Sequence, residues 1–135
     1  MAIENEIQKI RSLATDFDKL DTQMKIIVSE WQGSYVEGVW TSNLHDNTEK
    51  DFSILERLFN LNDSLSRLFK EYSAIIKAYP ELDNIINKGM MKLNIATGKI
   101  QNGNFTFVDA SDLDSFHTSW MELHQNIEAF IKKIT

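Results

Sequence analysis

Apolar residues recur along the chain in steps of three and four, the spacing that places side chains on one face of an α-helix. The first series predicts a helix over about residues 2–32 and comprises Ile10, Leu13, Phe17, Leu20, Met24, Ile27 and Trp31. The second predicts a helix over about 47–79 and comprises Leu58, Leu61, Leu65, Leu68, Tyr72, Ile75 and Tyr79. Both series alternate as a heptad seam does, so we expect these helices to pack lengthwise against one another.

Two further helices are predicted, over about 81–97 and 111–134. Pro80 suits the first turn of the third helix, because the N–H that proline lacks has no intrahelical partner there. Ser111, with Asp114 three residues later, is the predicted N-cap of the fourth helix, as Asp46 with Glu49 is for the second. The fourth helix has its own seam, which comprises Leu113, Phe116, Trp120, Leu123, Ile127, Phe130 and Ile134.

Between the third and fourth helices the sequence predicts a small β-hairpin. Asn102-Gly103 stands between β-prone runs, and both residues tolerate the positive φ angles of a tight hairpin turn. We therefore expect strands within residues 98–108. The expected fold is mainly α: one domain over residues 1–135, built as an antiparallel bundle of about four helices with this hairpin.

Charge and composition narrow the possible functions. The 135 residues include no cysteine and give a formal net charge of −6. Scattered lysines and arginines on an acidic chain disfavour direct nucleic-acid binding, which needs clustered positive charge. The N-terminus has no apolar block typical of a signal peptide, and no stretch is long and apolar enough to cross a membrane. We expect a cytoplasmic protein without membrane contact, although leaderless secretion stays open.

The sequence offers little for catalysis or metal binding. It contains no nucleophile elbow, no glycine-rich phosphate loop and no dinucleotide motif. His117 and His124, with Asp114 and Glu128 one turn away, are the best candidate metal ligands. Seven residues separate the two imidazoles by about 10 Å along a helix, so one ion cannot bridge them without ligands from other helices. We therefore expect no enzyme activity, no metal and no cofactor.

An aromatic stretch, SEWQGSYVEGVW at residues 29–40, begins at the end of the first helix, and residues 32–45 are expected to form an irregular connection to the second helix. The aromatic residues of this stretch either close the end of the bundle or remain exposed as contacts for another protein. The candidate partner-binding residues are Tyr35, Val36, Val39 and Trp40. A second candidate patch, on the acidic surface of the last helix, comprises Asp112, Asp114 and Glu122. Such a patch favours encounter with a basic partner.

These features predict a small acidic protein-interaction domain, for instance an inhibitor or immunity-type binder of a basic protein. Two alternatives stay open. Trp31-Gln-Gly33 between amphipathic helices, with the Tyr79-x-x-x-Asp83 spacing, resembles the WXG100 (ESAT-6-like) proteins. That resemblance implies a helical hairpin exported by type VII secretion. The other alternative is a self-assembling structural protein, and a homodimer is possible in either case.

Overall fold

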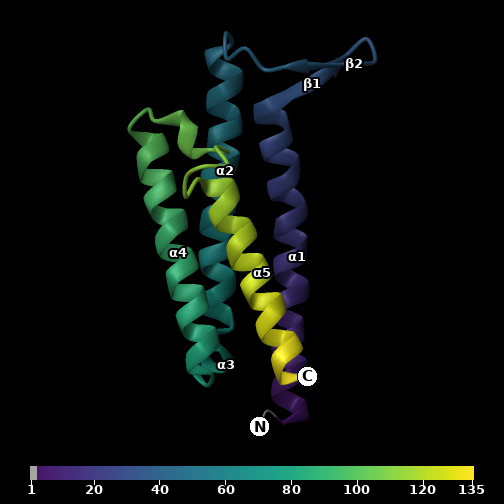
Figure 1. Ribbon diagram of the computed structural model, residues 1–135, viewed down its shortest axis with the longest axis vertical. Coiled ribbons are helices and arrows are strands. Elements are labelled where there is room, and N and C mark those ends of the chain that lie inside the picture. The colour runs from purple at the N-terminus through teal and green to yellow at the C-terminus, as the bar shows by residue number, and fades with distance from the viewer. Residues whose placement is uncertain (1–2) are drawn as a thin grey trace.

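Four long antiparallel helices make up the bundle in a computed structural model that describes residues 3–135 (Figure 1). They are α1 (Glu4–Gln32), α2 (Thr48–Glu71), α4 (Pro80–Gln101) and α5 (Phe116–Ile134). The shorter elements are β1 (Gly33–Val36), β2 (Val39–Ser42), α3 (Ser73–Lys77) and the 3-10 helix η1 (Phe105–Phe107). A mainly α fold with a two-stranded hairpin is confirmed. Within residues 3–135, no helix is both long enough and apolar enough to span a membrane.

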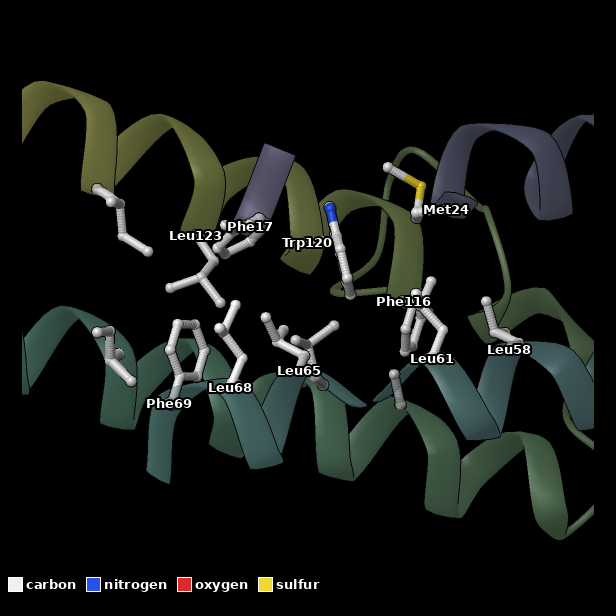
Figure 2. Close-up of a cluster of buried hydrophobic side chains, with 14 of the residues drawn as sticks. Phe17, Met24, Leu58, Leu61, Leu65, Leu68, Phe69, Phe116, Trp120 and Leu123 are labelled. Atoms are coloured by element: carbon white, nitrogen blue, oxygen red, sulfur yellow. The ribbon is translucent and has the colours of Figure 1, made fainter. Parts of the chain in front are cut away.

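The predicted seams meet in one core. Figure 2 shows side chains from α1, α2 and α5 converging on it. Every seam residue of α1 is buried except Leu20, which is partly buried and packs against the same core. The largest fully buried side chain is Trp120, followed by Phe17 and Phe116. Because burial of each such side chain contributes roughly 1.5–3 kcal/mol, the shared seam is the main source of stability.

The helix predicted over 47–79 buries the apolar face that the sequence indicated, but in the structure it is divided into two helices, α2 and α3. α2 ends at Glu71, and Tyr72, with φ −99° and ψ 13°, separates it from α3. The Tyr72 hydroxyl donates to Asp16 Oδ2 at 2.7 Å. This hydrogen bond, together with burial, raises the pKa of Tyr72 to about 12. The interruption leaves the seam intact, since Ile75 beyond it is buried.

The predicted hairpin over 98–108 is wrong, because α4 continues through Gln101. Asn102-Gly103 ends this helix instead of turning between strands. Gly103 has φ +90°, its N–H donates to Ile100 O, and Asn104 N–H donates to Lys99 O. Those two bonds define a Schellman C-cap. A helix cap and a hairpin turn both need positive φ, and a dipeptide suited to one therefore suits the other.

Two predicted N-caps are also displaced. The Asn47 side chain caps α2, one residue after Asp46, and accepts from Lys50 N–H at 3.1 Å. The Ser115 side chain caps α5 and accepts from Thr118 N–H at 3.2 Å, whereas Ser111 lies in a turn. The preceding loop is tied to the helix start, because His117 N–H donates to Val108 O and Val108 is buried. That contact keeps residues 109–115 out of the helix.

Two glycines of α4 provide a paired test of the packing between α4 and α5. A Cβ at Gly89 would lie 2.6 Å from Leu123 Cδ1 and 2.9 Å from its Cγ, whereas a Cβ at Gly98 would meet nothing within 4 Å. We expect Gly89→Ala to destabilise by about 1–3 kcal/mol, partly offset by a gain of about 1 kcal/mol in helix propensity. Gly98→Ala should stabilise by about 0.5–1 kcal/mol. Urea denaturation of both variants checks this, and shifts of the same sign would contradict it.

Candidate protein-binding surface at the hairpin end

Residues 33–42 form an antiparallel β-hairpin at the end of the bundle where α1 finishes and α2 begins (Figure 1). The strands pair Tyr35 with Trp40 and Val36 with Val39. The turn residues Glu37 and Gly38 have φ 51° and 79°, as a type I′ turn requires. The expected irregular connection is therefore wrong. Its sequence does carry a strand signal, because β-branched and aromatic residues flank a two-residue turn that contains glycine.

All four hairpin residues that the sequence proposed as partner-binding are exposed. Tyr35 is 73% exposed, Val36 53%, Val39 65% and Trp40 46%. Since side chains alternate along a strand, the two aromatic residues share one face and the two valines share the other. The aromatic rings meet edge to face, with centroids 5.4 Å apart. The hairpin thus presents apolar side chains to solvent on both faces, although two strands alone are marginally stable in water.

A polar cluster fixes the base of the hairpin to the bundle. Asp51, in the first turn of α2, is only 6% exposed. It accepts a hydrogen bond from Asn43 Nδ2 at 3.0 Å and lies 2.9 Å from His45 Nδ1. Asn43 Nδ2 also donates to the carbonyl of Trp31 at the end of α1. The chain that leaves β2 is therefore tied to both α1 and α2, which orients the hairpin.

Gly33 lets the two strands approach closely where the hairpin begins. A Cβ at Gly33 would lie 2.3 Å from Thr41 O and 3.0 Å from the Trp40 ring. Its backbone is extended, with φ 165°, so the requirement for glycine is steric. The Trp-x-Gly motif therefore leads into a strand here, whereas the WXG100 resemblance implied a turn between helices. Trp31 itself is a core residue, 4% exposed.

We expect Gly33→Ala to disrupt the hairpin and leave the bundle folded. The new methyl group would push β2 away and separate the rings of Tyr35 and Trp40. NMR contacts between these rings should disappear while the melting temperature stays within a few degrees, because no core residue is altered. Ser34→Ala, at an exposed position in the same strand, is the matched control. Retained ring contacts in Gly33→Ala would refute the steric argument.

More apolar surface lies at the same end of the bundle. Leu44, after β2, is 78% exposed, and Phe52 in α2 is 59% exposed. Phe52 borders a groove of about 610 Å³ between α2 and the end of α4, which Phe105 also lines. Phe105 in turn packs edge-on against Trp31, with centroids 5.7 Å apart. Exposed apolar side chains that gather at one place are typical of a contact surface for another protein.

The hairpin end is also acidic. No lysine or arginine occurs between Lys25 and Lys50, and the acidic residues in that interval are Glu30, Glu37, Asp46 and Glu49. Arg57 of α2 pairs with one of them, Glu30. The other three carboxylates have no lysine or arginine beside them within residues 26–49. The segment therefore carries negative charge beside its exposed apolar side chains.

The second predicted patch, on the acidic surface near α5, is partly neutralised. Lys92 of α4 places its ammonium 3.0 Å from Glu122 and 3.8 Å from Asp114. The hydrogen bond to Glu122 raises the pKa of Lys92, opposed by desolvation and aided by attraction to both carboxylates. Asp112, the third member of the patch, is exposed in the preceding loop. Sequence reasoning missed Lys92 because it lies on a different helix.

The structure divides the candidate metal-ligating residues: His124 and Glu128 lie together with Asp18, whereas His117 and Asp114 lie apart from them. His124 Nε2 lies 2.7 Å from Asp18 Oδ1 of α1 and 3.4 Å from Glu128 Oε1. Among the described residues, neither His117 nor Asp114 joins this cluster. Imidazole and carboxylate are ligands that zinc accepts. The contact between His124 and Asp18 is a hydrogen bond that joins α1 to α5, and Glu128 lies beside His124 on α5.

No protein-family model, curated protein or solved structure matches this chain. A functional argument therefore depends on the hairpin end itself: exposed apolar side chains, a fixed base and negative charge.

Proposed function

We propose that the protein is a non-enzymatic interaction domain that binds another protein through its β-hairpin. The observation that carries the proposal is the exposure of four apolar side chains on both faces of a hairpin whose base is tied to α1 and α2. Tyrosine and tryptophan are the residues that most often dominate binding energy at interfaces. A fixed base reduces the conformational entropy that binding removes, which favours affinity.

The charge of the hairpin end favours a basic partner. The acidic residues of residues 26–49 would steer such a partner to the hairpin and would raise the association rate more than the affinity. They would also oppose contact with the hairpin end of a second copy, because like charges would face one another. An inhibitor or immunity-type binder of a basic protein fits these properties. Association should weaken as ionic strength rises, since exposed charges are screened.

Site-specific photo-crosslinking in the producing cells tests the proposal. A benzophenone amino acid at Tyr35 should give a discrete adduct with a different protein. The same group at Ile95, which is 52% exposed on α4, serves as the control and should not give that adduct. The proposal fails if position 35 forms no adduct, forms the same adducts as position 95, or crosslinks only to a second copy of this chain.

A further inference from the structure

We infer that the outer edge of β2 pairs with an extended basic segment of the partner, which adds a third strand to the hairpin. The inference rests on the proposed function and specifies the contact. A two-stranded sheet leaves one edge of each strand without a backbone partner. Addition of a strand to such an edge is a general mode of peptide recognition. Affinity then comes from backbone hydrogen bonds, and specificity comes from the side chains on either face.

The register identifies the backbone groups that are available. Val36 and Val39 flank the two-residue turn and therefore exchange hydrogen bonds with each other, and the pattern alternates along the strands. Trp40 and Ser42 consequently direct their N–H and C=O groups away from β1. Within residues 3–135, these groups have no hydrogen-bond partner outside the hairpin. Both residues are exposed, so a new strand can reach them.

The edge of β1 is less suited to this role. The N–H of Gly33, on that edge, already donates to Ser29 O at the end of α1. Lys50 and Arg57 of α2 line the groove that Gly33 and Ser34 border. A basic segment would therefore find one backbone donor fewer there and would meet the ammonium of Lys50, beside the Arg57–Glu30 ion pair in the same groove. The edge of β2 has neither disadvantage.

The position of the acidic residues indicates the chemistry of the added strand. Glu37 lies in the turn at one end of β2; at the other end Asp46 lies in the loop and Glu49 in the first turn of α2. A segment with lysine or arginine at both ends and β-branched residues between them would match this arrangement. Its central side chains would lie beside Trp40 on one face and beside Val39 on the other. A second copy of this acidic chain lacks that complementarity.

Three blocked peptides, each added to the full-length protein, test the inference. The first, Lys-Lys-Val-Thr-Val-Thr-Val-Lys-Lys, should bind and slow amide exchange at Trp40 and Ser42 by roughly tenfold or more at saturation. The second, Lys-Lys-Val-Pro-Pro-Pro-Val-Lys-Lys, has the same charge, but its three consecutive prolines remove central N–H donors from both edges of the strand. The third replaces every lysine of the first with glutamate. Neither the second nor the third should protect these amides.

Removal of charge from the turn gives a further check on the same peptide. Glu37→Asn keeps a residue that tolerates positive φ and should weaken binding of the lysine-valine peptide by about twofold to fivefold. Glu71→Gln, an exposed acid at the far end of α2, is the control and should leave binding unchanged. An equal effect of both substitutions would remove the argument from charge.

Several outcomes overturn the inference. They are the absence of peptide binding, equal binding of the proline peptide, and protection at Tyr35 in place of Trp40 and Ser42. In each case adducts from position 35 would still form if the hairpin contacts its partner by side chains alone. The inference would then fail while the proposed function stands. Absence of those adducts would instead reject the proposed function, whatever the peptides do.

Discussion

Trp120→Ala is expected to lower the free energy of unfolding by about 3–5 kcal/mol. Trp120 is fully buried, and its ring lies 5.2 Å from that of Phe17 and 5.7 Å from that of Phe116, measured between centroids. Removing the indole leaves a large cavity between α1, α2 and α5, which the rigid seams cannot fill. Since small domains are stable by only about 5–15 kcal/mol, the variant should be close to unfolding at moderate temperature.

Part of this effect comes from a buried polar contact. Trp120 Nε1 donates to Asp21 Oδ1 at 2.9 Å, and Asp21 is only 7% exposed. Its other oxygen lies 3.1 Å from Lys25 Nζ. Trp120→Phe keeps much of the ring volume but removes the N–H, so one carboxylate oxygen loses its partner. We expect this variant to be destabilised by about 1–3 kcal/mol, between the wild type and Trp120→Ala.

Urea denaturation followed by circular dichroism measures both variants, since the midpoint and slope together give the free energy of unfolding. Met121→Ala is the matched control, because Met121 is the next residue of α5 and is 42% exposed. It should change stability by less than about 1 kcal/mol. A loss at Trp120 no greater than that at Met121 would contradict the assignment of Trp120 to the centre of the core.

The helices could be predicted because their periodicity is a local property of the chain. Each seam repeats every three or four residues, and burial on one face is the arrangement that satisfies it. Ile10, Leu13 and Met24 in α1 are all fully buried, as the pattern predicts. Helix boundaries were less predictable, since several polar residues near each end can serve as a cap. Both Ser111 and Ser115 suit a cap, and the structure uses Ser115, where His117 N–H donates to Val108 O.

The sequence places the hairpin at the wrong position because two dipeptides, Asn102-Gly103 and Glu37-Gly38, both allow the positive φ angles of a tight turn. Asn102-Gly103 has the stronger turn preference, yet Ile100 just before it is 2% exposed and extends the buried face of α4. Burial of that residue keeps residues 98–101 helical. Glu37-Gly38 has a weaker preference, but the apolar residues on either side of it are exposed, so no buried helical face competes with the turn. Tertiary packing, which a local turn preference does not include, decides between the two positions.

The residues of the candidate site could be predicted from the sequence, but their arrangement in space could not. Tyr35 and Trp40 stand out in the sequence as aromatic residues beside glycines. Their exposure, and the cluster around Asp51 that fixes the hairpin, depend on contacts between separate elements. The same reason explains the acidic patch, where Lys92 of α4 neutralises charge that the sequence of α5 alone leaves unpaired.

Trp31→Ala and Trp40→Ala should separate stability from binding within one short segment. Trp31 is 4% exposed, and its ring lies 4.4 Å from that of His45 between centroids. Its loss should cost about 3–5 kcal/mol of folding stability and should loosen the loop that anchors the hairpin. Trp40 is 46% exposed and its ring meets that of Tyr35 across the strands, so its loss should cost only about 0.2–1 kcal/mol.

Binding should respond mainly to Trp40. Truncating an aromatic hot-spot residue at the centre of an interface costs at least about 2 kcal/mol of binding free energy. Trp40→Ala should therefore weaken binding of the partner by roughly thirtyfold. Thermal melting and the yield of photo-crosslinks from position 35 measure the two effects. Leu13→Ala, a buried change in the part of α1 away from the hairpin, is the control for destabilisation without loss of contact residues. A large fall in melting temperature for Trp40→Ala would place Trp40 in the core, and unchanged crosslinking would remove it from the interface. Either result would show that binding through the hairpin does not depend on the Trp40 ring.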